Sequence, residues 1–128
     1  MNFKKSRTIA AIVLLLALAG CGPGFVRSEL YFGSARAGAA DITLTEWQKF
    51  VDEVITPRFP NGLTVLEGNG QWQMRDGSLA KEKSRIVIVV HPGTAGEQKK
   101  LDEIREAYKT RFSQEAVLEI DEDAKVKF

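Results

Sequence analysis

One stretch, residues 43–74, constrains the fold of this 128-residue chain more than any other. It begins with an apolar stripe made by Trp47, Phe50, Val51, Val54 and Ile55. Side chains spaced i, i+3, i+4, i+7 and i+8 lie on one face of a helix, so an amphipathic helix is predicted here. The sequence after it predicts a sharp reversal into a strand, which makes the stretch half of a two-layer α/β unit.

The predicted helix has two candidate N-terminal caps. Thr45 followed by Gln48 fits a capping box, and Thr43 followed by Glu46 fits the same pattern two residues earlier. Both alternatives are compatible with the apolar stripe, so the sequence leaves the first helical residue open.

Prolines end the helix. Pro57 and Pro60 each push the preceding residue out of the helical region, and the sequence Phe-Pro-Asn-Gly at 59–62 fits a type I or type II turn. We expect one long strand over residues 63–74, with a bulge or kink at the Gly-Asn-Gly sequence 68–70. A hairpin turn at Gly68-Asn69 is the alternative, although Asp76-Gly77 offers a better-placed reversal.

The other predicted elements complete a recognisable order. They are a strand at 27–33, a strand at 84–91 closed by a turn at 91–93, a helix at 97–112 with a stripe at Leu101, Ile104, Tyr108 and Phe112, a strand at 116–120, an acidic turn at 121–123 and a short edge segment at 125–128. The order β-α-β-β-α-β predicts an α+β fold, the ferredoxin-like two-layer sandwich with one antiparallel sheet and both helices on one face. Trp47 and Tyr108 are expected in its core.

The strand at 84–91 indicates that the second face of the sheet is also apolar. Residues 86–90, IVIVV, are uninterrupted by polar residues, which is typical of burial on both faces. A sheet face left bare in water should be more polar. A second copy of the chain, a lipid surface or a ligand could cover it, and we expect a homodimer.

Residues 1–20 have the features of a secretory signal. Three basic residues precede an apolar run, residues 9–19, that is too short to span a membrane. The sequence Leu-Ala-Gly-Cys at 18–21 resembles the lipobox of bacterial lipoproteins. That resemblance implies cleavage before Cys21 and a diacylglycerol attached to its sulfur. The alternative is an ordinary secretory signal with an incidental cysteine.

Lipidation would determine both the chemistry and the location of the chain. Cys21 is the one cysteine, so a lipidated chain has no thiol for disulfides, nucleophilic catalysis or Cys-based zinc sites. Two or three acyl chains would anchor it firmly to a membrane. Gly22 occupies the position where aspartate commonly signals inner-membrane retention, which favours the outer membrane, facing the periplasm, in a Gram-negative source.

The remaining chain has the size and charge of one weakly acidic domain. Removing residues 1–20 takes away three of the 18 basic residues and none of the 17 acidic ones. Nucleic-acid binding calls for a basic surface, so that class of partner is disfavoured. We expect a lipidated tether at 21–27 and a single ferredoxin-like domain at 28–128.

The segments GLTVLEGNGQWQ (62–73), EKSRIVIVVHP (82–92) and AYKTRFSQEAVL (107–118) resemble a family of small bacterial lipoproteins known only as a domain of unknown function. The likeness covers nearly all of residues 28–128, and RFPNGLTVL (58–66) with GQW (70–72) is its most specific part. The resemblance implies the domain limits and the lipoprotein character. It implies no activity, cofactor or catalytic residue.

His91 is a candidate functional residue because it is the one histidine and lies at a strand end. It could act as an acid or a base, whereas a usual zinc site would need further ligands. The alternative is a packed turn residue. A hydrolase built on Ser84, His91 and Glu82 is rejected, because Ser84 lies on a strand and no nucleophile-elbow motif is present.

Gln71, Trp72 and Arg58 are the other candidates for ligand binding. Trp72 places a large amphipathic ring beside amides, a combination that binds sugars or flat ligands; the alternative places Trp72 in the core. Arg58 could reach a carboxylate or phosphate, or be a solvated loop residue. Residues 121–123 do not have the spacing of a calcium loop, and no metal or cofactor is expected.

Two classes of function remain. The first is a binding or interaction module, dimeric through its open sheet face. The second is a small cofactor-free enzyme with a pocket between sheet and helices, by analogy with other ferredoxin-like families.

Overall fold

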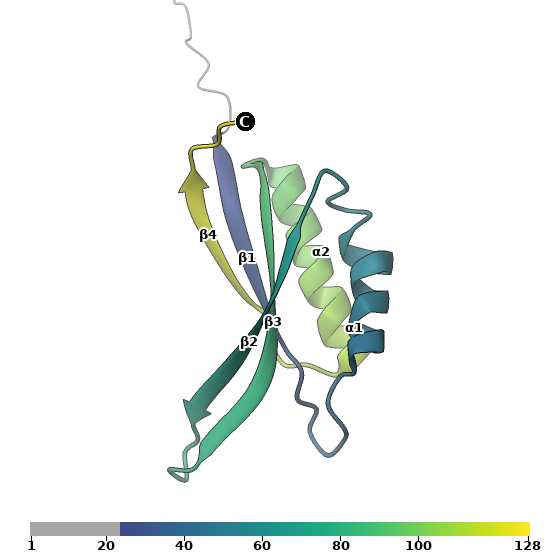
Figure 1. Ribbon diagram of the computed structural model, residues 1–128, viewed down its shortest axis with the longest axis vertical. Helices are drawn as coiled ribbons and strands as arrows, with labels where there is room; N and C mark the ends of the chain where they lie inside the picture. Colours follow the sequence, from purple (N-terminus) through teal and green to yellow (C-terminus); the bar gives the residue numbers. More distant parts are fainter. Residues whose placement is uncertain (1–23) are drawn as a thin grey trace, which may run out of the picture.

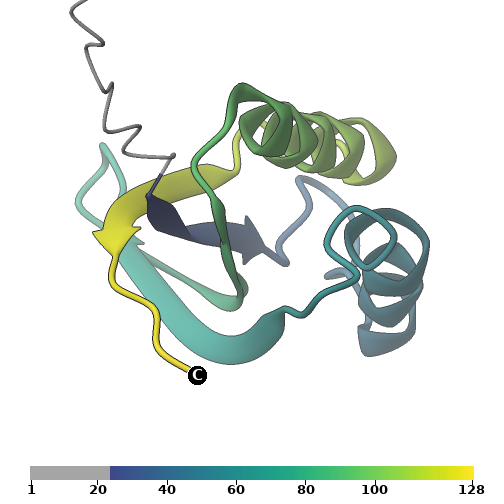
Figure 2. The same ribbon diagram turned by 90° about the horizontal axis from the view of Figure 1, so that it is seen from above.

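The computed structural model describes residues 24–128 (Figure 1). Its elements follow the predicted order: β1 (Phe25–Gly33), α1 (Leu44–Phe50), a π-helical turn η1 (Val51–Ile55), β2 (Thr64–Gln73), β3 (Leu79–Pro92), α2 (Ala95–Phe112) and β4 (Leu118–Ala124). The four strands form one antiparallel sheet in the order β2-β3-β1-β4. Both helices cover the same face of that sheet (Figures 1 and 2). The ferredoxin-like fold is therefore confirmed.

The capping box at Thr43 begins the first helix. The Thr43 hydroxyl accepts from the Glu46 N–H, and the Glu46 carboxylate accepts from the Thr43 N–H at 2.8 Å. The alternative cap at Thr45 is wrong. The helix is also not uniformly α-helical, because the Thr56 N–H donates to the Val51 carbonyl five residues back at 2.9 Å. This wider π-helical turn keeps Val51, Val54 and Ile55 buried together just before the proline stop.

The β2–β3 hairpin is longer than predicted. β2 pairs residue for residue with β3 through Gly68↔Ser84 and Gly70↔Glu82, so the predicted bulge is absent and the alternative turn at Gly68-Asn69 is wrong. The reversal lies where Asp76-Gly77 predicts it, with Gly77 at φ 87°. β3 starts at Leu79 rather than Ser84. The sequence did not predict its first residues as strand, because Lys81, Glu82 and Lys83 are polar and this part of the hairpin overhangs the body of the domain (Figure 1).

Other strand limits differ from the predictions. β1 begins at Phe25, so residues 25–27, which we assigned to the tether, pair with both β3 and β4. Asp121, Glu122 and Asp123 belong to β4 and form no acidic turn, because Ser28 and Arg27 of β1 pair with this segment. No strand is assigned to residues 125–128, where an edge segment was expected. His91 and Pro92 extend β3, so the turn predicted to begin at His91 is wrong.

An aromatic cluster fills the layer between sheet and helices. It contains Phe32 from β1, Trp47 and Phe50 from α1, and Tyr108 and Phe112 from α2, with ring centroids 4.7 to 6.1 Å apart. The Tyr108 hydroxyl donates to the Gly33 carbonyl at 2.8 Å, and burial raises the pKa of Tyr108. The predicted core positions of Trp47 and Tyr108 are confirmed.

Candidate functional site

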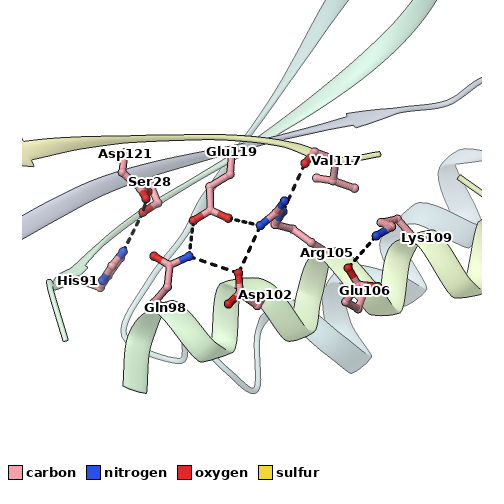
Figure 3. A network of polar contacts seen from close by, with 10 residues as sticks. All are labelled: Ser28, His91, Gln98, Asp102, Arg105, Glu106, Lys109, Val117, Glu119 and Asp121. Atoms are coloured by element: carbon pink, nitrogen blue, oxygen red, sulfur yellow. Dashed lines mark hydrogen bonds and ion pairs between the residues drawn. The ribbon is translucent and has the colours of Figure 1, made fainter. Parts of the chain in front are cut away.

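His91 lies in a hydrogen-bonded chain that links three strands (Figure 3). Ser28 on β1, His91 on β3 and Asp121 on β4 all point to the helix side of the sheet. The Ser28 Oγ lies 2.8 Å from the His91 Nε2 and donates to the Asp121 Oδ1 at 2.5 Å. The His91 Nδ1 lies 2.9 Å from the Pro92 carbonyl oxygen. Ser28 is fully buried and His91 almost so.

Counting hydrogens defines what this chain can do chemically. A carbonyl oxygen only accepts, so the contact with Pro92 requires a hydrogen on the His91 Nδ1. The contacts between His91 and Ser28 and between Ser28 and Asp121 require one hydrogen each. A neutral imidazole, a hydroxyl and a carboxylate together carry two. With a neutral imidazole, one of the three contacts is therefore left without a hydrogen.

A cleft of about 270 Å³ lies beside the hydrogen-bonded residues Ser28, His91 and Asp121. It is formed where the ends of β1, β3 and β4 meet the start of α2, and its lining is Val26, His91, Gly93, Thr94, Ala95, Gln98, Asp121, Glu122 and Asp123. Asp121, Glu122 and Asp123 make up one wall, and His91 is the one basic residue that residues 24–128 contribute to the lining. Gly93 is required at this point, because a Cβ there would approach Val26 Cγ2 to 2.9 Å.

Polar contacts hold α2 against β4 next to the cleft (Figure 3). The Gln98 Nε2 donates to the Glu119 Oε1 at 2.7 Å, and the Arg105 Nη1 donates to the Glu119 Oε2 at 3.0 Å. The Glu119 side chain is largely buried between these two donors. This pairing fixes the helix start, and with it the wall of the cleft, relative to the strand that carries Asp121.

The four candidate residues from the sequence do not form one site. Arg58 donates to the Val54 carbonyl at 2.8 Å and pairs with Glu103 of α2 at 3.1 Å, so it holds the first helix against the second. Trp72 is 48% exposed and is not in the core. Gln71 pairs with Lys81, ten residues along β3 from His91, and ten strand residues span roughly 33 Å. His91 lies at a cleft with Asp121 and Asp123, whereas Gln71 lines a separate groove with Lys81 and Lys83.

Sequence reasoning missed Ser28 and Asp121. Ser28 shares the buried face of β1 with Leu30 and Phe32, and a serine in an apolar alternation was the available signal. Asp121 carried no such signal, because its position depends on the register between β1 and β4. The rejection of a Ser84 hydrolase agrees with the geometry, in which Ser28 and not Ser84 contacts His91.

The sheet face opposite the helices carries exposed apolar side chains. We call this surface the open face; it consists of Phe25, Arg27, Glu29, Tyr31, Thr64, Leu66, Ser84, Ile86, Ile88, Val90, Leu118, Ile120 and Glu122. Leu118 is 57% exposed and Leu66 is 48% exposed. Its polar members include a row along β1, where Arg27 pairs with Glu29 at 2.5 Å and the Tyr31 hydroxyl donates to Glu29.

Comparison with family models identifies the chain. Residues 27–128 match DUF3574, described as a protein of unknown function. The chain belongs to this family. The match covers the whole sheet except the first two residues of β1, and it confirms the resemblance found in the sequence. A search of curated proteins finds no match for this DUF3574 chain.

Solved structures with the same fold are distant in sequence. A phage SAM lyase in complex with S-methyl-5′-thioadenosine is similar with a TM-score of 0.60 and 18% identity, over 80% of this chain and 82% of the lyase. CutA from Synechococcus elongatus PCC7942 is similar with a TM-score of 0.51 and 10% identity, over 80% of each chain. At these identities the likeness shows the fold of this DUF3574 protein and nothing of its chemistry.

Two further observations concern membranes and metals. Neither α1 nor α2 of the described residues is long and apolar enough to cross a membrane. Between residues 24 and 128 no three His, Asp or Glu side chains are grouped so that they could hold a metal ion. The predicted signal at 1–20 and the lipidation of Cys21 lie outside the described residues.

Proposed function

We propose that this DUF3574 protein is a lipid-anchored binding module of the cell envelope that pairs with a second copy of itself through the open face. The observation that carries the proposal is the exposure of five large apolar side chains on the open face: Phe25, Leu66, Val90, Leu118 and Ile120. Apolar groups clustered on one face of a monomer favour an interface.

Charge supports a second copy as the occupant. The row on β1 contains both signs, and Arg27 also lies 3.7 Å from Glu122. In a two-fold dimer the same patch of each protomer meets the other, so a row with both signs of charge can be self-complementary. An acyl chain or a bare bilayer would offer Arg27 and Glu29 no polar partner beyond those they already have within the chain.

Lipidation at Cys21 would orient the domain. Cys21 precedes Gly24 by three residues, which span at most about 11 Å. The Gly24 carbonyl accepts from the Gly93 N–H at 2.9 Å, so the anchor would emerge beside the cleft that contains His91. The β2–β3 hairpin lies at the opposite end of the sheet (Figure 1) and would point away from the membrane.

A small enzyme is the second candidate, and the chain of Ser28, His91 and Asp121 is the observation in its favour. Its geometry supports binding better than catalysis. The Ser28 hydroxyl is fully buried, so no substrate carbonyl reaches it, and both nitrogens of His91 are already engaged. A catalytic role would require one of these contacts to break first.

The test of the proposal is the mass of the full chain in an uncharged detergent. Light scattering after gel filtration should give a dimer for the wild type and a monomer for Leu118→Lys, because a charge in the interface is left unpaired. Leu79→Lys is the matched control, since Leu79 is 60% exposed but lies at the hairpin tip. A monomeric wild type, or a dimer in all three proteins, contradicts the proposal.

A further inference from the structure

The β2–β3 hairpin extends beyond the body of the domain (Figure 1). We call residues 68–83, the part of the hairpin that overhangs the body, the arm. β1 ends at Gly33, opposite Ser84, so no third strand of the described residues lies beside the arm. The arm is nevertheless paired residue for residue to its last pair, Gln73↔Leu79. A two-stranded hairpin is only marginally stable by itself in water, so this length of paired arm favours a partner that packs against it.

The two sides of the arm differ in chemistry. Side chains alternate across a strand, and the helix side of the arm is polar except for Leu79 near the tip. The other side continues the row of the open face that contains Leu66, through the pairs Gly68↔Ser84, Gly70↔Glu82 and Trp72↔Ala80. Trp72 is the one large apolar side chain on this second side of the paired strands, and it is 48% exposed.

The Trp72 ring stands above small neighbours. Gly70 precedes it in the same row, and Ala80 lies opposite. Glu82, the one charged residue on this side of the arm, points back to the body, where its Oε2 accepts from the Ala35 N–H at 3.3 Å. No aromatic pair or cation–π contact between residues 24 and 128 includes Trp72. The ring is therefore free to pack against another molecule.

The open face of the body is small for a stable self-association. Nine residues of β1 at about 3.3 Å each, across four strands about 4.8 Å apart, outline a patch of at most roughly 600 Å². Stable protein–protein interfaces bury about 800 Å² on each partner. The paired strands of the arm add roughly 170 Å², so the open face and the arm together approach the size that a stable dimer needs.

We propose that the arm completes the self-association surface and that Trp72 anchors it on the second copy of the chain. This inference rests on the proposed pairing through the open face. Tryptophan is among the residue types that contribute most binding energy at protein interfaces, and the polar helix side of the arm stays in water. An isologous dimer contains the Trp72 contact twice, so each substitution at this position removes two contacts.

A second copy suits the arm better than a membrane does. The lipid anchor of the proposed function would emerge beside Gly24, whereas the hairpin lies at the opposite end of the sheet (Figure 1). Trp72 also continues a row whose next large member, Leu66, belongs to the open face. A partner that covers Leu66 therefore reaches the start of the arm as well.

The test uses the full chain with both tryptophans replaced by 5-fluorotryptophan, in the uncharged detergent of the dimer measurement. Trp72→Phe assigns the two fluorine NMR signals, and a soluble gadolinium chelate broadens the signal of any ring that water reaches. We expect the Trp72 signal to be protected in the wild type and broadened in Leu118→Lys, the expected monomer in the same detergent. The Trp47 signal is the internal reference and should be protected in both, because Trp47 is 2% exposed.

Trp72→Ala should raise the dissociation constant of the dimer, measured by light scattering over a dilution series, by at least about tenfold. Leu79→Ala is the matched control on the helix side of the same hairpin, where Leu79 is 60% exposed, and should leave the dissociation constant within about twofold of the wild type. Both variants should melt as the wild type does, because neither side chain is in the core.

The outcomes separate this inference from the proposed function. A wild-type dimer in which Trp72 is broadened as strongly as in Leu118→Lys overturns the inference and leaves the pairing of the open faces standing. Unchanged dissociation in Trp72→Ala, or equal weakening by Leu79→Ala, does the same. A monomeric wild type overturns both.

Discussion

Three polar side chains, Ser28, His91 and Asp121, connect β1, β3 and β4 where these strands meet the start of α2. A buried polar network of this kind stabilises a fold only when all its members are paired. Ser28 is the central member, since its one hydroxyl contacts both other residues. Its removal therefore affects two partners at once.

Ser28→Ala should lower the free energy of unfolding by about 1–3 kcal/mol, because it leaves the His91 Nε2 and the Asp121 Oδ1 without their partner. Urea denaturation followed by tryptophan fluorescence measures the change. Ser84→Ala is the matched control, on the opposite face of the sheet, and should stay within about 0.5 kcal/mol of the wild type. Equal stability of all three proteins would show that the network contributes nothing.

At this scale the sequence predicted His91 but not its partners. His91 could be singled out as the one histidine at a strand end. Ser28 and Asp121 are 93 residues apart, and no local pattern states which residues of β1 and β4 lie opposite each other. Gln71 and Trp72 were placed together by adjacency in sequence, yet successive strand residues point to opposite faces.

Among the elements, the first helix has the best-defined start. The Glu46 carboxylate accepts from the Thr43 N–H, from Arg36 at 2.7 Å and from the Thr43 hydroxyl. The backbone hydrogen bond from Thr43, followed by Arg36 and the Thr43 hydroxyl, holds the pKa of Glu46 at about 2. A lowered folded-state pKa means that this contribution to stability is present above the ordinary value of 4.5 and is lost as the pH falls towards 2.

Thr43→Ala should raise the pKa of Glu46 towards its ordinary value and lower the free energy of unfolding by about 1 kcal/mol, because the helix loses its cap. Carbon-13 NMR of the Glu46 carboxyl follows the pKa, and urea denaturation follows stability. Thr45→Ala removes the alternative cap and should change neither. A wild-type Glu46 that titrates near 4.5 would contradict the capping geometry.

The elements that bury a regular apolar stripe were predicted well, and the others were not. The stripe of α2 is buried as expected, because helical spacing alone places Leu101, Ile104 and Tyr108 on one face. The start of β3 was missed because the sequence Lys-Glu-Lys at 81–83 has no buried face. Its strand structure comes from pairing with β2, a long-range contact that is absent from any local pattern.

As a whole, the molecule is a sheet with helices on one face and an apolar surface on the other. The open face was predicted from residues 86–90, which are apolar at every position, while only alternate ones, Val87 and Val89, pack beneath the helices. What covers the open face depends on partners and on the membrane. The pattern of polar and apolar residues in one chain does not encode them. The self-association and the lipid anchor stay predictions.

Mass spectrometry of the protein extracted from bacterial membranes tests the anchor. The intact mass should correspond to residues 21–128 plus a diacylglycerol and, in many bacteria, one further acyl chain. Cys21→Ser should remain uncleaved and unmodified, because the resemblance at 18–21 implies a thioether to this sulfur. A wild-type protein cleaved without any lipid mass would contradict the anchor and favour the ordinary secretory signal.

The most direct test of the open face is an isotope-filtered NOE measurement on a one-to-one mixture of labelled and unlabelled full chain in detergent micelles. The account predicts intermolecular NOEs between methyl groups of Leu66, Ile86, Ile88, Leu118 and Ile120, because only contact between two open faces brings these groups together. Intermolecular NOEs confined to other surfaces, or none in a sample whose methyl signals are all observed, would contradict it.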